Sequence, residues 1–367
     1  MNIVIFGGSF DPVHLGHVKM ASYVAEEYNA DVYFVPAKIS VWKSESVSIN
    51  DKLNMLRLAI EGNPRLKIDE FELRRKEDTT YSITTVRYFK EKFPNDTLYF
   101  LMGADQAASF HKWNDCLELS ELARILYYPR NEIRIPIDNI LKYQMELVDG
   151  GLYQASATDI RSLSNLYLDE KVLNYILEHE LYFVKHVKSL YSEKRYLHAL
   201  SVARTAIEIA RSNSLLFDSL LTYFFLAGYL HDIAKRMPIE EQRAIMAEYF
   251  PEYLSMPEFS YHQFVGAYLA EREFGIEDVF ILDAIKYHAT GRALMTNLEK
   301  IIYAADKIEP TRGYDSSELI EAMKNDYETG FIEVLKHNKD YLLEGGKDIH
   351  NPLTDECLDY YLGDQQE

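Results

Sequence analysis

The sequence has few cysteines and an excess of negative charge, and both features limit what the protein can be. Only two of its 367 residues are cysteine, Cys116 and Cys357, and they lie far apart and outside any Cys-x-x-Cys motif. They give no basis for a disulfide framework and fit a reducing cytoplasm, where we expect the protein to be. Lysine and arginine number 39 against 58 aspartate and glutamate residues, a net charge of −19. Such a chain repels a phosphate backbone, so nucleic acid is not expected as a partner.

Long apolar runs and low-complexity stretches are also missing. The most apolar stretch, residues 220–230, is about half as long as a bilayer-spanning helix, so no membrane partner is expected. The first residues show no basic segment ahead of an apolar one, which argues against a secretory signal. Hydrophobic residues make up 47% of the chain, which is enough for two cores at about 150 residues per domain.

The first half of the chain alternates short apolar runs with segments of helical spacing. Strands are predicted at residues 3–6, 32–35, 98–102 and 125–128. Helices are predicted between them, at residues 14–28, 53–60, 81–93 and 117–123. This alternation predicts an α/β fold, in which helices cover both faces of a parallel sheet. Ligands of such sheets bind at the carboxyl ends of the strands, which directs attention to the loops at Gly7, Pro36, Gly103 and Pro129.

The second half shows helical spacing almost throughout and predicts an all-helical domain. Its predicted helices are residues 197–210, 215–230, 264–274, 279–287 and 298–308. The boundary falls between Val184 and Ser189, which gives domains of residues 1–186 and 190–367. Ser260 and Gln263 have the spacing of a capping box, which would place His262 in the first turn of a helix.

A phosphate-binding motif follows the first predicted strand. Residues 7–17 read Gly-Gly-Ser-Phe-Asp-Pro-Val-His-Leu-Gly-His. Glycines at this point let backbone N–H groups approach a phosphate, and the positive end of the next helix points to the same place. His14 and His17 are three residues apart, so they share one helical face and can bind phosphate oxygens as charge develops. Gly16 between them leaves room for a nucleotide.

These eleven residues resemble the motif of the nucleotidylyltransferase superfamily, specifically of bacterial nicotinate-mononucleotide adenylyltransferases. The resemblance extends over residues 1–184 and rests on four later segments: residues 80–85, residues 103–105 with Trp113, residues 156–161 and residues 172–182. It implies a Rossmann-like fold and the transfer of AMP from ATP to nicotinate mononucleotide, which gives deamido-NAD and pyrophosphate. Mg²⁺ is expected with ATP.

The resemblance also implies a role for each matching residue. Alignment of the reactants and charge stabilisation fall to His14, His17, Lys43 and Arg161. Nucleotide binding falls to Gly8, Ser9, Phe10 and Thr158, and binding of the nicotinate side falls to Tyr81, Ser82, Asp105 and Trp113. Residues 40–42 read Ser-Val-Trp where the family has Pro-Pro-His before the lysine. This departure leaves another acceptor, such as nicotinamide mononucleotide, as an alternative.

Histidines and aspartates of the helical half predict a metal site. An apolar segment, residues 227–230, ends on the pair His231 and Asp232, and burying that pair costs several kcal/mol unless partners satisfy it. The candidate ligands are His198, His231, Asp232, His262, His288 and Asp306. A set without cysteine favours iron, manganese or zinc over calcium. Two ions about 3.5–4 Å apart would activate a water and clamp a phosphate.

The helical half resembles HD-domain phosphohydrolases, and within them the branch that cleaves diadenosine tetraphosphate (Ap4A) symmetrically. The resemblance covers residues 190–362 and rests on His262 with residues 195–198, 230–235, 287–291 and 305–310. It implies that the six candidate ligands hold two divalent metal ions, with iron expected first and manganese or zinc as alternatives. Asp232 would also orient or deprotonate the attacking water.

The resemblance implies hydrolysis of Ap4A to two ADP, so the chain as a whole is predicted to be a bifunctional enzyme. Three basic side chains are candidates for binding the polyphosphate: Lys235, Arg292 and Arg312. Ala289, beside one predicted ligand, stands where the branch often has threonine. The alternative is a helical half that senses nucleotides and regulates the transferase without turnover. The oligomeric state and any communication between the two sites are left open.

Overall fold

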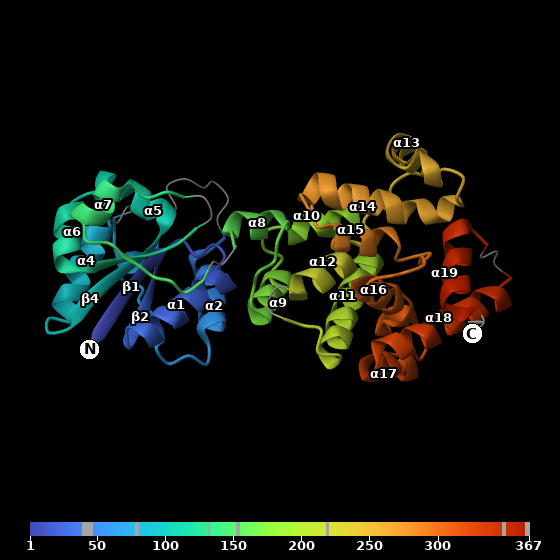
Figure 1. Cartoon of the computed structure of the whole chain (residues 1–367), viewed down its shortest axis with the longest axis horizontal. Coiled ribbons are helices and arrows are strands. Elements are labelled where there is room, and N and C mark those ends of the chain that lie inside the picture. The colour runs from blue at the N-terminus through green and yellow to red at the C-terminus, as the bar shows by residue number, and fades with distance from the viewer. Residues whose placement is uncertain are drawn as a thin grey trace. The chain divides into compact units, whose positions relative to one another are not determined.

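The structure is a computed structural model, which describes residues 1–38, 47–77, 81–130, 133–151, 155–217, 220–346 and 350–363. The chain divides into two compact units (Figure 1). The first unit comprises Met1–Arg161 and Tyr167–Tyr182, and the second comprises Ser162–Leu166 and Phe183–Glu367. Among the described residues, no helix has both the length and the apolar character that crossing a membrane requires.

One parallel sheet of six strands forms the centre of the first unit, in the order β3-β2-β1-β4-β5-β6. The strands are β1 (Asn2–Gly8), β2 (Ala30–Pro36), β3 (Leu66–Ile68), β4 (Thr97–Gly103), β5 (Arg124–Tyr128) and β6 (Glu146–Leu147). The four predicted strands are confirmed as β1, β2, β4 and β5. Their apolar runs follow from burial on both faces of the sheet. The chain leaves β1 toward β2 and later returns to β4 on the other side of β1, so the strand order reverses there.

Helices cover both faces of this sheet, as the alternating pattern predicts. In Figure 1, α4 and α6 lie on one side of the strands and α1 and α2 on the other. The helices of the first half are α1 (Leu15–Glu27), α2 (Ile49–Ile60), α3 (Phe71–Arg74), α4 (Ser82–Lys92), α5 (Ala104–Ser109), α6 (Cys116–Leu122), α7 (Ile137–Lys142), α8 (Ala157–Ser162) and α9 (Glu170–Glu178). The core under α4 and α6 includes the buried rings of Phe89, Phe100 and Phe110.

The second unit is helical, and its described residues contain no strand, which confirms the predicted fold class. Its helices are α10 (Val184–Leu190), α11 (Glu193–Ser212), α12 (Leu220–Leu230), α13 (Ile239–Tyr249), α14 (Tyr261–Phe274), α15 (Val279–Lys286), α16 (Asn297–Ile308), α17 (Ser317–Asn325), α18 (Tyr327–Glu344) and α19 (Pro352–Leu362). Helix α12 is buried along almost its whole length and packs against α11, α15 and α16. It is therefore the central element of this unit.

The predicted capping box at Ser260 and Gln263 is wrong. Ser260 precedes α14, but its backbone is helical (φ −90°, ψ −12°) rather than extended, because residues 258–260 form a 3₁₀ turn. Its hydroxyl donates to the carbonyl of Pro257 at 2.7 Å and does not cap the helix. The carboxamide of Gln263 bonds to the loop that follows α15 instead.

Gly228 lets α11 and α12 approach each other closely. A Cβ atom built at this position would lie 2.6 Å from the Cα and 2.8 Å from the backbone nitrogen of Ala203. Backbone atoms yield less readily than the end of a side chain, so we expect Gly228→Ala to lower the free energy of unfolding by about 1–3 kcal/mol. Urea unfolding followed by far-ultraviolet circular dichroism measures this loss. Gly345→Ala is the control, because its Cβ would meet nothing closer than 3.4 Å, and an equal effect of the two substitutions would contradict the prediction.

Candidate active sites

A cavity of about 240 Å³ lies at the carboxyl ends of β1, β4 and β5, where the strand order predicts a ligand site. Several residues that the sequence singles out line it: Gly8, Ser9, Phe10, His14, His17, Asp105 and Thr158. Because no Cβ stands over Gly8, the buried ring of Phe10 packs within about 3 Å of where one would lie. The backbone of the glycine turn therefore lies close to the ring of Phe10.

His14 and His17 cap helix α1 reciprocally. The backbone N–H of His17 donates to Nδ1 of His14, and the backbone N–H of His14 donates to Nδ1 of His17, both at 3.3 Å. The two rings stack with their centroids 3.6 Å apart. Because each Nδ1 accepts a hydrogen bond, the proton of each neutral ring resides on Nε2. The cap thus fixes two imidazoles as a pair of N–H donors that belong to the lining of the cavity.

Burial keeps both imidazoles uncharged at neutral pH. It lowers the pKa of His14 from 6.5 to about 3, with a further contribution from the charge of Arg130. Burial also holds the pKa of His17 well below its usual range, helped by His14 and Arg130. A neutral N–H donor still stabilises a phosphate oxygen that gains negative charge, and it does not bind the ground-state phosphate as tightly as a cation would.

The lowered pKa of His14 predicts that the first unit loses stability in acid. An unfolded chain protonates this residue near pH 6.5, whereas the folded unit resists protonation down to about pH 3, so its stabilising contribution is complete above pH 6.5 and declines below it. We expect a loss of about 2 kcal/mol between pH 7 and pH 5. Tryptophan fluorescence reports the unfolding of this unit selectively, because Trp42 and Trp113 both belong to it. His14→Gln does not titrate, so an unchanged pH dependence in that variant would contradict the assignment.

Arg161 is held beside the cavity by its own neighbours. Its guanidinium donates to the backbone carbonyl of Asp11 at 2.5 Å and to the hydroxyl of Thr158 at 3.0 Å. The Ser156 hydroxyl accepts from the backbone N–H of Thr158 at 3.1 Å at the start of α8. The loop of residues 7–17 and the predicted phosphate motif of residues 156–161 therefore meet, although 150 positions separate Asp11 from Arg161.

Two further lining residues were not singled out by sequence reasoning. Arg130 lies two positions beyond β5, and its Nε is 3.7 Å from a carboxylate oxygen of Asp105. Tyr128, the last residue of β5, also lines the cavity, and burial raises its pKa. The loop at Pro129 was indicated because it follows a predicted strand, but nothing in its composition distinguished these side chains.

The residues predicted for the nicotinate side do not all line the cavity. Asp105 does, whereas Trp113 packs beside the core, with its ring centroid 5.3 Å from that of Phe110. Tyr81 and Ser82 lie at the start of α4, where the Tyr81 side chain is exposed, and neither lines the cavity. Lys43 falls outside the described residues, together with the Ser-Val-Trp departure at residues 40–42.

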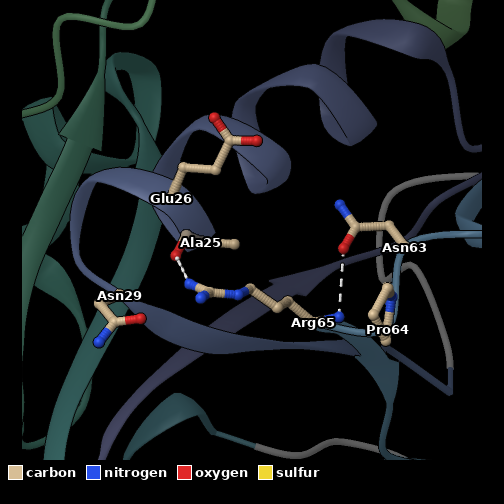
Figure 2. A pocket seen from close by; sticks show the side chains of 6 residues that line it. All are labelled: Ala25, Glu26, Asn29, Asn63, Pro64 and Arg65. Atoms are coloured by element: carbon tan, nitrogen blue, oxygen red, sulfur yellow. Dashed lines mark hydrogen bonds between the residues drawn. The ribbon is translucent and has the colours of Figure 1, made fainter.

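A shallow pocket at the opposite end of the sheet carries no comparable chemistry. It occupies about 530 Å³ and is lined by Ala25, Glu26, Asn29, Asn63, Pro64 and Arg65 (Figure 2). The guanidinium of Arg65 donates to the carbonyl of Ala25 at 2.8 Å, and the backbone N–H of Arg65 donates to the Asn63 side chain at 3.1 Å. Figure 2 shows these groups bonded within the wall of the pocket, so they hold the turn together.

In the second unit, the predicted ligands from five separate segments come together. Two groups of side chains have possible metal-ligand atoms within 4.8 Å of one another. The first group is His198, His231 and Asp232, and the second group is Asp232, His262 and His288. Asp232 belongs to both. Its Oδ2 lies 3.8 Å from Nε2 of His231, and its Oδ1 lies 3.3 Å from Nε2 of His262. Asp306 joins the first group, with Oδ1 at 3.1 Å from Nε2 of His198.

Hydrogen bonds to the outer ring nitrogens orient three of these histidines. Nδ1 of His231, His262 and His288 each lies 2.7 Å from a backbone carbonyl three residues earlier in the chain. Each Nδ1 therefore donates, which leaves the lone pair on Nε2 for the interior of the site. Nε2 of His231 is buried and has no hydrogen-bond partner among the described residues. A buried unpaired nitrogen is costly unless a cation completes it.

Most of the protonation states also suit metal ligands. The exception is His198, where burial lowers the pKa but hydrogen bonds with Asp306 and Glu309 raise it to about 9, so a metal ion would displace a proton there. Burial lowers the pKa of His231 to about 3, so the ring is neutral.

Burial alone would raise the pKa of Asp232 and of Asp306, but other contacts outweigh it and hold both well below their usual range. At Asp232 these contacts come from the neighbouring imidazoles, His231 foremost. At Asp306 they come first from the charges of Lys307 and Arg312. Neutral imidazoles and ionised carboxylates are what a divalent ion of the iron, manganese or zinc class requires. The residues present therefore fit divalent metal binding.

Glu309 supports the first group and was not predicted as a site residue. Its carboxylate lies 2.8 Å from Nδ1 of His198 and accepts from the hydroxyl of Thr311 at 2.8 Å. It is buried, and although burial raises its pKa, the bonds from His198, Ser201 and Thr311 lower that pKa to about 2. A carboxylate behind a ligand histidine fixes the ring and increases its basicity.

Basic side chains surround the carboxylates of this centre. Lys235 lies 3.0 Å from Nε2 of His262, and Arg312 bonds to Asp306. Two cations that were not predicted as site residues also contact the carboxylates: Arg195 bonds to Asp232, and Lys307 donates to Asp306 at 2.8 Å. The predicted polyphosphate contact Arg292 points elsewhere.

Arg292 is engaged in a partly buried ion pair. Its guanidinium donates to Glu299 at 2.6 Å and to Asp283 at 3.0 Å, and it lies over the ring of Tyr287. Glu299 is fully buried and also caps α16. These bonds show that Arg292 links α15 to α16 and is not directed at the metal ligands.

The fold and the two sites define a protein with a nucleotidyltransferase-type α/β unit and a helical unit of the HD type. The cytidylyltransferase-like family matches residues 5–163, and the HD domain family matches residues 195–311. Two similar proteins carry the name "Probable nicotinate-nucleotide adenylyltransferase/Ap4A hydrolase". The one from Mycoplasma genitalium is 30% identical over 91% of this chain and 97% of its own length. The one from Mycoplasma pneumoniae is 32% identical over 91% of this chain and 98% of its own length. The chain belongs to this two-domain family.

A relative that matches only part of this chain is named for one of these two activities. A protein from Bacillus subtilis named "Bis(5'-nucleosyl)-tetraphosphatase, symmetrical" is 39% identical over 167 residues, which are 44% of this chain and 87% of that protein. The two-domain relatives match nearly the whole chain, so the family joins the α/β unit to a helical unit whose relatives also occur as separate proteins.

Proposed function

We propose that the chain is a bifunctional enzyme with one activity in each unit. Residues 1–186 transfer AMP from ATP to nicotinate mononucleotide, and residues 190–367 hydrolyse Ap4A to two ADP. The observation that carries the first activity is the reciprocal cap that aims His14 and His17 at the cavity. The observation that carries the second is the position of Asp232 between two ligand groups.

In the transferase, the residues of the cavity align two phosphates and stabilise charge. The phosphate of the acceptor mononucleotide attacks the α-phosphorus of ATP, a new P–O bond forms, and pyrophosphate leaves with the electrons of the broken bond. The acceptor phosphate is already an anion, so no strong base is needed. Nε2–H of His14 and His17 donate to oxygens whose charge grows in the transition state. Arg161, fixed by Asp11 and Thr158, and Arg130 add positive charge beside them.

In the hydrolase, water adds to one of the two central phosphorus atoms of Ap4A. The bridging bond breaks, one ADP leaves, and the added oxygen stays with the other ADP. Two divalent ions bound by the two ligand groups would activate the water and hold the polyphosphate. Asp232 reaches both groups and orients the water or takes its proton. Lys235 and Arg312, with Arg195 and Lys307, neutralise the charge of the leaving phosphate.

The proposed function also implies particular metals, partners and a location. Iron is the metal we expect in the helical unit, with manganese or zinc as substitutes, and Mg²⁺ is expected to enter the other site with ATP. The partners are small nucleotides: ATP, nicotinate mononucleotide and Ap4A. Nucleic acid and membranes are not expected as partners, and the cytoplasm is the expected location.

Two assays of the full chain test the proposed function. With ATP, Mg²⁺ and nicotinate mononucleotide, deamido-NAD and pyrophosphate should form in equal amounts, and nicotinamide mononucleotide should serve as a poorer acceptor. With Fe²⁺ or Mn²⁺ and Ap4A, ADP should be the only nucleotide product. Equal use of both acceptors would mean that the altered loop has changed specificity. Absence of ADP under every metal would favour the alternative that the helical unit is a nucleotide sensor.

A further inference from the structure

Gln263 bridges two segments that carry metal ligands. It directly follows His262 in α14 and is fully buried. Its Oε1 accepts from the backbone N–H of Ala289 at 3.1 Å and of Thr290 at 3.3 Å. Its Nε2 donates to the hydroxyl of Thr290 at 3.1 Å. These are the two residues that follow His288, so one side chain connects the neighbourhoods of two ligands that are 26 positions apart in the chain.

The bonds that orient the two rings do not by themselves set the distance between them. Nδ1 of His262 bonds to the carbonyl of Phe259, and Nδ1 of His288 bonds to the carbonyl of Ile285, both at 2.7 Å. Each bond orients a ring relative to its own helix. The distance between the two rings depends on how α14 and the loop after α15 are held together. Their Nε2 atoms lie 3.2 Å apart, close enough to bind one ion together with Asp232.

We propose that Gln263 is a positioning residue for the second group, which sets the distance between His262 and His288. The proposal rests on the proposed metal centre. It follows from the geometry of the carboxamide, whose two ends are both used: Oε1 holds two backbone N–H groups and Nε2 holds a side chain. Ala289 has no side chain beyond Cβ and contributes only its N–H, which makes the amide of Gln263 the polar link at this point.

The position of Gln263 also explains why its side chain does not cap α14. A capping role would turn the carboxamide back toward Ser260, whereas here it crosses to the neighbouring loop. An apolar side chain of the same length would leave the buried N–H groups of Ala289 and Thr290 without an acceptor. The loop would then shift to find other partners, and His288 would move with it.

The test is a manganese titration of the full-length chain after removal of endogenous metal. Wild type should bind two Mn²⁺ per chain and give the paramagnetic resonance spectrum of a coupled pair. Gln263→Met should weaken one of the two ions by about 10–100-fold, the range for residues behind a metal ligand, and give the spectrum of a single ion. Full binding of two ions at wild-type affinity by Gln263→Met overturns the positioning role.

Two further variants separate positioning from general loss of stability. Asn213→Leu removes another amide that joins helices of this unit, through bonds of 2.8 Å to the carbonyls of Ile209 and Met323. It should bind two Mn²⁺ like wild type, and an equal loss in this control overturns the proposal. Thr290→Val keeps both N–H bonds and removes only the hydroxyl, so it should weaken the same ion measurably. This variant serves as the test if Gln263→Met does not fold. Unchanged affinity in Thr290→Val then counts against the proposal. Failure of the wild type itself to bind Mn²⁺ would overturn the metal centre, which is a different result.

Discussion

Asp232→Asn should abolish hydrolysis of Ap4A, with a fall in kcat/KM of about 10³-fold or more, equivalent to roughly 4 kcal/mol of transition-state stabilisation. Asp232 is the side chain that both ligand groups share. Asparagine keeps one of the two oxygens, exchanges the other for an NH2 group that cannot bind a cation, and removes the negative charge that both groups share. The amide also cannot take a proton from water. Adenylyl transfer should stay within about twofold of wild type, because the cavity at the end of the sheet does not involve this residue.

The matched control for this substitution is Asp283→Asn. Asp283 is a carboxylate of the same unit that pairs with Arg292 at 3.0 Å and belongs to neither ligand group. We expect it to retain hydrolysis. Rates of ADP release for the three proteins at saturating Mn²⁺ decide the matter. Hydrolysis by Asp232→Asn within tenfold of wild type would exclude a central role for this carboxylate.

The second large effect is expected at His17. His17→Asn should lower kcat/KM for adenylyl transfer by about 10²–10³-fold, the range for loss of one donor to developing charge. The Asn oxygen lies near the place of Nδ1 and can still accept from the backbone N–H of His14, so the cap of α1 is preserved. What is lost is the N–H that belongs to Nε2.

His17→Gln distinguishes the donor from the cap. Its amide nitrogen reaches about as far as Nε2 of histidine, so this variant should recover part of the rate that His17→Asn loses. Initial rates of pyrophosphate release measure both, and Ap4A hydrolysis by the same samples reports that the chain is intact. Equal, small losses in the two variants would show that the imidazole of His17 acts only through the helix cap.

Much of the fold could be predicted because burial leaves a strong local pattern. The run at residues 3–6 is apolar throughout, as a strand covered on both faces must be, and β1 occupies it. Edge strands leave little signal: β3 (Leu66–Ile68) and β6 (Glu146–Leu147) are too short to show a period, and neither was predicted. The capping box at Ser260 failed because a tertiary contact of Gln263 competes with a local one.

The site residues also differ in how strong a signal they leave in the sequence. His231 and Asp232 could be singled out because a charged pair at the end of an apolar helix needs partners. Glu309 acts behind His198, and its side chain has no sequence signal apart from the segment in which it lies. Arg130 contributes to the first cavity from a loop whose position, but not whose residues, could be predicted. Residues that act through three-dimensional neighbours are the ones that a single sequence conceals.

The most direct test of the account is elemental analysis of the purified full-length chain, together with Asp232→Asn. The arrangement of His198, His231, Asp232, His262, His288 and Asp306 predicts two transition-metal ions per wild-type chain, with iron dominant after anaerobic purification. Asp232→Asn should retain fewer than one. A wild-type chain that holds no stoichiometric metal, or a variant that still holds two ions, would contradict the proposed centre.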